Sequence, residues 1–275
     1  MLTEETWAFT QLVEHVDFAP ESHPYGVGER DGIRVVRYLV ERAGSFGVHV
    51  ERGLHQLAWH TGGDLAVFAA DEFHLLPPSQ CIWIPAGTPH DIACTAPGEL
   101  FCLYLREEAS PFAPSNTPVR IAADDLMRGL MRHLASPLTK EEGLRARAVL
   151  LDALPSRVHT QPTLPMPSDP AARMLAEQFL ETPASPPLLE QAAQLARISA
   201  RTLQRRFVAE TGLTYREWKT RARLSLALPL LEAAKPVKEV AWLVGYATPS
   251  AFISAYAAEF GMTPGRGGTY GVTAP

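Results

Sequence analysis

The sequence predicts an α+β chain of two domains, an N-terminal antiparallel β jelly-roll barrel with helices and a C-terminal all-α domain with two helix-turn-helix units. Short apolar runs separated by turn residues fill the first half, and one helix–turn–helix pattern occurs twice near the end. Charge is also divided unevenly between these parts. We expect the first domain over residues 1–154, a Pro-rich linker over 155–169 and the helical domain over 170–275.

The N-terminal half has the spacing of an antiparallel sandwich or barrel. Turn residues such as Arg52-Gly53 and Gly62-Gly63 separate the apolar runs, whereas residues 1–30 carry no clear signal. The expected strands are 33–40, 47–51, 55–59, 64–69, 81–84, 91–94 and 100–105.

Polar residues of these strands form the candidate effector and metal site. His49 and Glu51 are two apart and share one strand face, while His55 and His90 begin later strands. Inside a jelly roll they could converge, and three imidazoles with a carboxylate suit Zn²⁺, Fe²⁺, Ni²⁺ or Mn²⁺. A polar pocket without metal is the alternative, and we favour it. Trp59 is a further candidate effector contact, as core or pocket wall.

Two histidines and two helical patterns complete the first domain. We expect His60 and His74 at the surface. Residues 123–135 have a helical apolar pattern, and Thr139 with Glu142 forms a capping box before a second helix. These helices either dimerise or pack on the barrel, and the sequence leaves both open. The Pro-rich segment that follows predicts a stiff, extended linker.

One pattern occurs twice between residues 188 and 263. A gapless shift of 49 positions places Glu190 on Glu239, Phe207 on Tyr256 and Gly212 on Gly261 in the sequence. Matching caps, apolar positions and stop residues indicate two copies of one supersecondary unit.

Each copy predicts a helix, a turn and a second helix. Ser199 and Thr248 are N-caps of the second helices, because their hydroxyls can accept a free amide proton. Gly212 and Gly261 end those helices. Residues 215–233 predict one long connecting helix, with Pro229 inside it kinking it or freeing a carbonyl.

The polar faces of the two second helices differ. The first offers long donors that suit guanine and adenine edges in the major groove, whereas the second offers short hydroxyls and one apolar side chain. A solvated charged face is the alternative for such arginines, but the repeat and its caps favour DNA contact. The candidate DNA-binding residues are Ser199, Arg201, Thr202, Gln204, Arg205, Thr248, Ser250, Ile253 and Ser254.

The C-terminal third resembles the DNA-binding domain of the AraC/XylS family of bacterial transcription regulators. The matching stretches are SARTLQRRF (199–207), ETGLTYREW (210–218), RLSLALPLLEA (223–233), EVAWLVGYATPSAF (239–252) and FGMTP (260–264). The resemblance implies two helix-turn-helix units that enter successive major grooves of double-stranded DNA, with Arg201, Gln204 and Arg205 at the base-contacting positions. Ala234 stands where this family usually has a helix-ending glycine.

The N-terminal region resembles the cupin sensor domains that precede such DNA-binding domains. The turn Pro85-Ala-Gly-Thr-Pro-His90 matches the cupin P-x-G-x-x-H motif, and HQLAW (55–59) with LPPSQCIWIPAGTPH (76–90) resembles one subgroup. The resemblance implies a small-molecule or metal effector, a homodimer, and contact with RNA polymerase if the protein is an activator. No cofactor is certain, and a divalent metal in the barrel is the candidate.

Charge and composition are consistent with a sensor joined to a nucleic-acid binder. Residues 170–275 hold 12 Lys and Arg against 8 Asp and Glu, a net +4, whereas residues 1–169 hold 13 against 22, a net −9. No apolar run approaches a membrane span, and the N-terminus lacks signal-peptide features. Three cysteines without metal spacing suit free thiols. We therefore expect a cytoplasmic protein.

Three functions remain open from the sequence. The leading one is a ligand-responsive, DNA-binding transcription regulator, activator or repressor, that is not an enzyme. The second is a cupin enzyme acting on a small molecule with an appended DNA-binding tail. The third is a DNA binder whose cupin domain only dimerises. No nucleophile–base–orienter set can be found in the sequence, so the enzyme hypothesis rests on the metal candidate alone.

Overall fold

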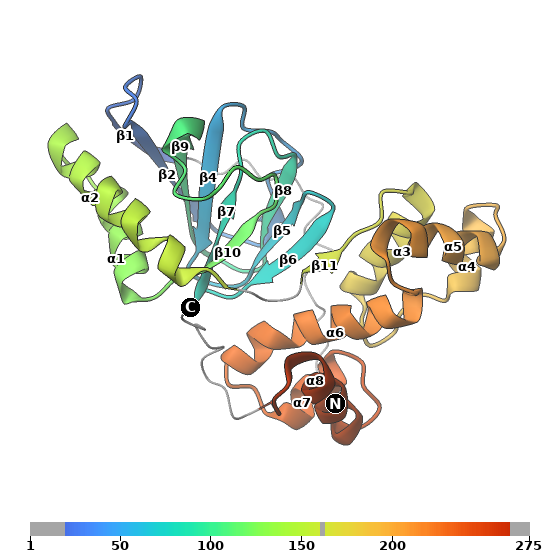
Figure 1. Ribbon diagram of the computed structural model, residues 1–275. Helices are drawn as coiled ribbons and strands as arrows, with labels where there is room; N and C mark the ends of the chain where they lie inside the picture. The colour runs from blue at the N-terminus through green and yellow to red at the C-terminus, as the bar shows by residue number, and fades with distance from the viewer. Residues whose placement is uncertain (1–19, 160–162, 265–275) are drawn as a thin grey trace. The chain divides into compact units, whose positions relative to one another are not determined.

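The computed structural model describes residues 20–159 and 163–264, and its two-domain α+β fold confirms the predicted class (Figure 1). Among these residues the chain forms two compact units. One holds the residues before 163 except 71–75, and the other holds 71–75 and the residues from 163 onward. We call them the N-terminal unit and the C-terminal unit.

The larger sheet is antiparallel and has six strands. In spatial order these are β1 (Pro20–Tyr25), β2 (Ile33–Val40), β9 (Gly98–Arg106), β4 (Leu54–His60), β7 (Gln80–Ile84) and β10 (Val119–Ala122). Strand β1 contains two prolines and lies at the edge, where a missing amide donor leaves no ladder bond unmade.

The second sheet has five short strands. Their order is β11 (Leu164–Pro165), β6 (Glu72–Leu76), β5 (Leu65–Ala69), β8 (His90–Cys94) and β3 (Gly44–Ser45). The described strands therefore form two antiparallel sheets, and the closed barrel that the sequence predicted is not present among them.

Strict alternation of side chains divides the N-terminal unit into two cores. On β9, Leu100, Cys102 and Tyr104 face the second sheet, where they pack with residues of β5 and β8 such as Val67 and Ile92. The alternate residues Phe101, Leu103 and Leu105 pack with α1 (Asp125–Leu134) and α2 (Lys140–Ala153). The helices therefore cover the outer face of the six-stranded sheet (Figure 1).

Three local predictions for the strands before residue 123 were wrong. No strand forms over residues 47–51: the left-handed Gly47 (φ 74°) interrupts the chain after β3, and only an isolated bridge joins His49 to His90. Strands β1, β6 and β10 lacked a clear pattern in the sequence. His60 and His74, expected at the surface, are 1% and 0% exposed.

The C-terminal unit is all-helical apart from the short β6–β11 pair. Its helices are α3 (Pro170–Glu181), α4 (Leu189–Leu195), α5 (Ala200–Thr211), α6 (Tyr215–Glu232), α7 (Val237–Leu243) and α8 (Pro249–Phe260). The long connecting helix is present as predicted, and it continues through Pro229.

Part of the predicted linker is packed. Leu164 and Met166 are buried, and the Trp218 indole of α6 donates a hydrogen bond to the Pro165 carbonyl at 2.6 Å. The segment from residue 163 onward therefore belongs structurally to the helical unit rather than being a free spacer. Residues 160–162 lie outside the described range.

Within residues 20–159 and 163–264, none of the helices combines the length and the hydropathy that crossing a bilayer requires.

Candidate DNA interface and effector pocket

The first candidate recognition helix, α5, is fixed at both ends as predicted. The Ser199 hydroxyl accepts a hydrogen bond from the Thr202 amide at 3.0 Å, and Gly212 ends the helix in the left-handed region. Leu203 and Phe207 are completely buried. Residues four apart share a helix face, so Arg201 and Arg205 lie together on the opposite, exposed side.

The polar residues of α5 have different roles. In the described chain, Arg201 and Arg205 make no hydrogen bond or ion pair, so their guanidinium groups are available. Arg206 instead binds Asp169, the N-cap of α3, at 2.7 Å. The Thr202 hydroxyl lies 2.8 Å from the Ser199 hydroxyl and belongs to the cap. Two free arginines on one face suit base edges in a major groove.

Gln204 lies between these arginines and the core. Its side chain is half-buried, and its Nε2 atom is buried without a hydrogen-bond partner among the described residues. An unsatisfied amide has an energetic reason to take an external acceptor. The predicted contact of Gln204 with an adenine edge therefore needs its Nε2 to turn outward, since that atom is buried in this structure.

The second candidate recognition helix, α8, begins as predicted but offers a different surface. The Thr248 hydroxyl accepts from the Ala251 amide at 3.2 Å, and Pro249 occupies the first helical position. Ser250 and Ser254 are exposed and Ile253 is half-buried. The helix thus presents short hydroxyls and an apolar side chain where α5 presents two arginines.

The structure corrects the gapless alignment of the two helix-turn-helix units. Helices α5 and α8 match at a shift of 49, but α4 and α7 match at 48. Their ends agree with this: the Ile198 amide donates to Ala193, and the Tyr246 amide donates to Ala241. The turn between α7 and α8 is therefore one residue longer than the turn between α4 and α5. Relative to the N-cap of the helix that follows, α7 ends one residue earlier than α4 does.

Helix α6 connects the two helix-turn-helix units through aromatic and cationic contacts. The completely buried Trp218 packs edge-to-face on Phe179 and Phe207, with ring centroids 5.6 Å apart in each case. The Arg223 guanidinium lies 5.6 Å from the ring centroids of Phe179 and Tyr246, which come from α3 and from the second turn. This packing joins α6 to α3, to α5 and to the turn before α8.

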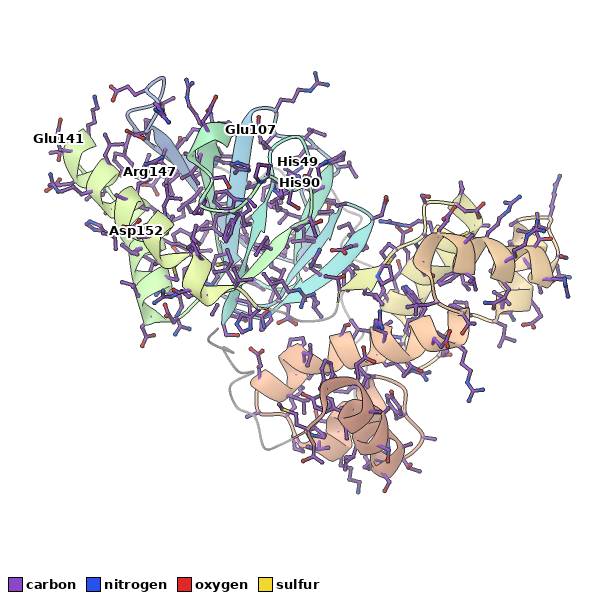
Figure 2. The ribbon with its side chains drawn as sticks, viewed as in Figure 1. His49, His90, Glu107, Glu141, Arg147 and Asp152 are labelled. Carbon is purple, nitrogen blue, oxygen red and sulfur yellow. The ribbon has the colours of Figure 1, made fainter. Side chains whose placement is uncertain are left out.

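The N-terminal unit contains a pocket of about 190 Å³ between its sheets. Three of the predicted effector residues fit this place: His49 and Glu51 line it, and the His90 ring lies 4.3 Å from the His49 ring (Figure 2). The other lining residues are Tyr38, Phe46, Gln56, Ile92, Leu100, Cys102 and Tyr104.

His90 is the centre of a buried hydrogen-bond network. Its Nδ1–H donates to the Thr88 carbonyl at 2.8 Å, and its Nε2 lies 2.7 Å from the Gln56 amide. Burial, with a smaller contribution from His49, lowers the pKa of His90 to about 4, so the ring is neutral at pH 7. The Gln56 NH₂ group must then turn to donate to Nε2, and the same amide lies 3.5 Å from the Tyr104 hydroxyl.

His49 is held in place through its backbone and its ring. Its backbone amide and carbonyl pair with those of His90, and its Nδ1–H donates to the Gly47 carbonyl at 2.8 Å. The Ser45 hydroxyl anchors this segment by donating to the Asp91 carboxylate at 2.6 Å and accepting from the Gly47 amide. The Nε2 of His49 is the ring nitrogen left for a bound molecule.

His55 and Trp59 lie on the other face of β4, which corrects the prediction that they join His49, Glu51 and His90. Side chains alternate along a strand, so Gln56 faces the pocket whereas His55 and Trp59 face outward. Trp59 is core, stacked on Phe101 and bonded to the Pro78 carbonyl at 2.8 Å.

His55 lines a second cavity of about 180 Å³ beneath the segment 107–119. Its Nε2–H donates to the Glu107 carbonyl at 3.1 Å, its Nδ1 accepts from the Ala86 amide at 3.0 Å, and its ring lies 4.8 Å from Trp83. Both nitrogens are therefore occupied by the backbone, which gives His55 a structural role in holding the turns around this cavity.

The predicted ligand set does not fit a metal ion. His55 is on the opposite sheet face, and both ring nitrogens of His90 have hydrogen-bond partners. Only His49 and Glu51 keep donor atoms that face the pocket. Across the described residues no cluster of three His, Cys, Asp or Glu side chains has the proximity that a metal requires.

The sequence missed most of the pocket wall, including Tyr38, Phe46, Gln56 and Tyr104. Strands β4 and β9 are apolar on both faces, so period-2 alternation could not show which residues point inward. The amide of Gln56, a polar side chain within a run predicted as a strand, was the available signal.

Low pH is expected to destabilise the N-terminal unit through His90. The unfolded ring binds a proton near pH 6.5, whereas burial lowers the folded pKa to about 4. The unfolded state therefore takes up more protons, and the free energy of unfolding falls by about 2 kcal/mol from pH 7 to pH 5. Thermal unfolding of wild type and His90→Gln at both pH values measures this.

His60 and His159, whose pKa values burial also lowers, leave a residual slope in the variant. The exposed His133→Gln is the matched control and keeps the wild-type slope. An unchanged slope in His90→Gln would contradict the assignment of a neutral, buried His90.

Comparison with known proteins agrees with this arrangement. A family model described as a helix-turn-helix domain matches residues 192–266. The HTH-type transcriptional regulator NimR of Escherichia coli K12 is 33% identical over 224 residues, which cover 80% of this chain and 81% of NimR. The HTH-type transcriptional regulator RipA of Corynebacterium glutamicum is 38% identical over 103 residues, covering 38% of this chain and 31% of RipA.

Solved structures give weaker likenesses. Fatty-acid-bound ToxT from Vibrio cholerae aligns over 92% of this chain and 95% of its own, with 9% identity and a TM-score of 0.34. The C-terminal domain of AraT from Geobacillus stearothermophilus covers 35% of this chain and 81% of its own, with 26% identity and a TM-score of 0.33. On the similarity to NimR and the helix-turn-helix match, this chain belongs to the AraC/XylS family of helix-turn-helix, DNA-binding transcription regulators.

Proposed function

We propose that this regulator responds to an organic effector bound between the two sheets of its N-terminal unit. The observation that carries the proposal is the pocket itself, in which His49, Glu51 and Gln56 present polar atoms beside apolar and aromatic walls. Ligand sites characteristically combine an apolar lining with a few placed polar groups. We infer an organic effector rather than a metal, because His90 and His55 have no ring nitrogen to spare.

We propose that α5 supplies most of the sequence readout and that α8 mainly contacts the DNA backbone. Arg201 and Arg205 are the free long donors on α5. At the start of α8, the Ser250 amide can bind phosphate, and Ile253 can contact a thymine methyl group.

The remaining parts of the proposal concern assembly and location. We propose a cytoplasmic homodimer that contacts RNA polymerase if it activates transcription, and no catalytic step. Helices α1 and α2 expose Leu126 (46%) and Val149 (48%), apolar surface that a dimer would cover. Sedimentation velocity gives the oligomeric state, and a turnover screen separates a sensor from an enzyme.

A fragment beginning at residue 163 is expected to fold and to bind DNA without any effector response. The reason is that Trp218 packs on Phe207 and donates its hydrogen bond to Pro165 within the fragment, although the fragment lacks β6, which pairs with Leu164. A fragment beginning at residue 167 loses the Pro165 acceptor and the side chains of Leu164 and Met166, and should be less stable by roughly 2–5 kcal/mol. Urea unfolding and selection from random DNA pools test both.

The full chain is the comparison for the effector response. It should bind the same selected DNA and change its affinity when a pocket ligand is added. If the 163–275 fragment is unfolded, or if it selects a different sequence, the separation of sensing from DNA binding is wrong.

A further inference from the structure

We propose that the pocket between the sheets takes a small organic cation, one that carries N–H donors on a compact, flat frame such as an amidinium or a guanidinium. This inference rests on the proposed role of the pocket as the effector site, and it names the chemical class of the effector.

The free polar atoms of the pocket are acceptors. Glu51 is its charged lining residue, and in the described chain its carboxylate has no hydrogen bond or ion pair. The Nδ1–H of His49 is used by the Gly47 carbonyl, which leaves Nε2 as the ring nitrogen available to a ligand. A ligand that satisfies the Glu51 carboxylate must bring donors, and a positive charge strengthens each bond.

The donors around the pocket are already used within the protein. The Gln56 amide bonds with His90 and lies next to the Tyr104 hydroxyl, and the hydroxyls of Tyr104 and Tyr38 bond with each other. Burial raises the pKa of the Cys102 thiol to about 12, so this side chain is neutral. An anion would therefore find few donors and would face the Glu51 carboxylate.

The walls favour a flat cation of limited size. Tyr38 and Phe46 meet edge-to-face with ring centroids 5.0 Å apart, and Tyr104 adds a third ring. Aromatic faces attract cations. The volume of about 190 Å³ is below the ~300–1,000 Å³ of pockets for drug-sized molecules. The ligand is therefore small.

One positive charge lies nearby. The Arg34 guanidinium is 5.1 Å from the Tyr104 ring centroid. Arg34 is exposed and is not a lining residue, so it supplies no donor inside the pocket. The positive charge of Arg34 reduces the preference of the pocket for a cation. The variant Arg34→Gln should therefore bind the cation more tightly than wild type.

The experiment compares benzamidine, benzamide and benzoate, which share one shape and carry charges of +1, 0 and −1 at pH 7. Calorimetric titration of the full chain should show benzamidine binding at least about tenfold more tightly than benzoate, the size of one charge-assisted hydrogen bond. Glu51→Gln should remove this preference. The control Glu41→Gln loses an exposed carboxylate just after β2 and should keep it.

Failure of the inference is distinguishable from failure of the proposed function. Absence of benzamidine binding, tighter binding of benzoate, or an unchanged preference in Glu51→Gln overturns the cation site. If benzamidine binds through Glu51 but leaves affinity for the selected DNA unchanged, the cation site stands and the pocket's regulatory role is wrong. A retained unfolding midpoint in Glu51→Gln shows that the variant is folded.

Discussion

Replacing Arg205 with alanine is expected to erase base preference at one or two adjacent positions of the DNA site, whereas replacing Ser254 leaves the selected sequence unchanged. The two residues occupy the same position on α5 and α8, since these helices match at a shift of 49. Arg205 is exposed and makes no hydrogen bond or ion pair in the described chain, so its planar fork is available for guanine. Loss of one bidentate contact costs about 1–3 kcal/mol of discrimination.

The other residues of the two helices give matched comparisons. Arg201→Ala should act like Arg205→Ala at a neighbouring base pair, and Ser250→Ala should act like Ser254→Ala. A hydroxyl lost from a phosphate contact lowers affinity slightly for every sequence. Arg206→Ala is the control on α5, because its guanidinium binds Asp169. It removes an arginine from the same helix and should leave the selected sequence unchanged.

Binding-site selection from a random DNA pool, run on wild type and these variants, gives the answer. The selected motifs are compared position by position, and affinities for one fixed site are measured at a single salt concentration. If Ser254→Ala reshapes the motif while Arg205→Ala lowers affinity evenly, sequence readout belongs to α8 and the assignment is wrong.

The helical unit could be predicted from sequence in detail because its signals are local. Ser199, Thr214 and Thr248 cap helices through hydroxyls that accept amides three residues later, and Gly212 and Gly261 end helices at φ 71°. Such contacts depend on a few neighbouring residues. The one-residue difference between the two turns was missed, because Ala192 falls on the apolar Val240 at a shift of 48 and on Ala241 at a shift of 49.

The pocket could be predicted only in part because strand faces depend on distant partners. His49, Glu51 and His90 lie in one region of the fold. His55 was predicted to join them, but it lies on the same face of β4 as Leu57, which packs outward. When both faces of a strand are buried, its sequence does not indicate which face is inside. Gln56 was therefore missed although it is the residue bonded to His90.

Replacing Gly245 with alanine is expected to destabilise the C-terminal unit by more than about 2 kcal/mol. Gly245 has a positive φ of 84° and follows the last turn of α7. A side chain in this region costs roughly 1–2 kcal/mol. An added Cβ would also lie 2.3 Å from the Pro183 carbonyl oxygen, a backbone atom that cannot move aside cheaply. The turn before α8 would have to shift.

Arg197 provides the matched test, because it occupies the same position after α4 and holds a φ of 55°. Arg197→Gly should be neutral or stabilising by up to about 1 kcal/mol, since glycine relieves backbone strain of roughly 1–2 kcal/mol but loses about 0.5–1 kcal/mol of conformational entropy. Urea unfolding of the 163–275 fragment measures both changes. If Gly245→Ala and Arg197→Gly cost the same, the two turns do not correspond at a shift of 48, and left-handed backbone is not what ends α4 and α7. The two substitutions are expected to change the free energy of unfolding in different directions. The turn after α7 has glycine where its left-handed backbone requires it, and the turn after α4 has arginine there.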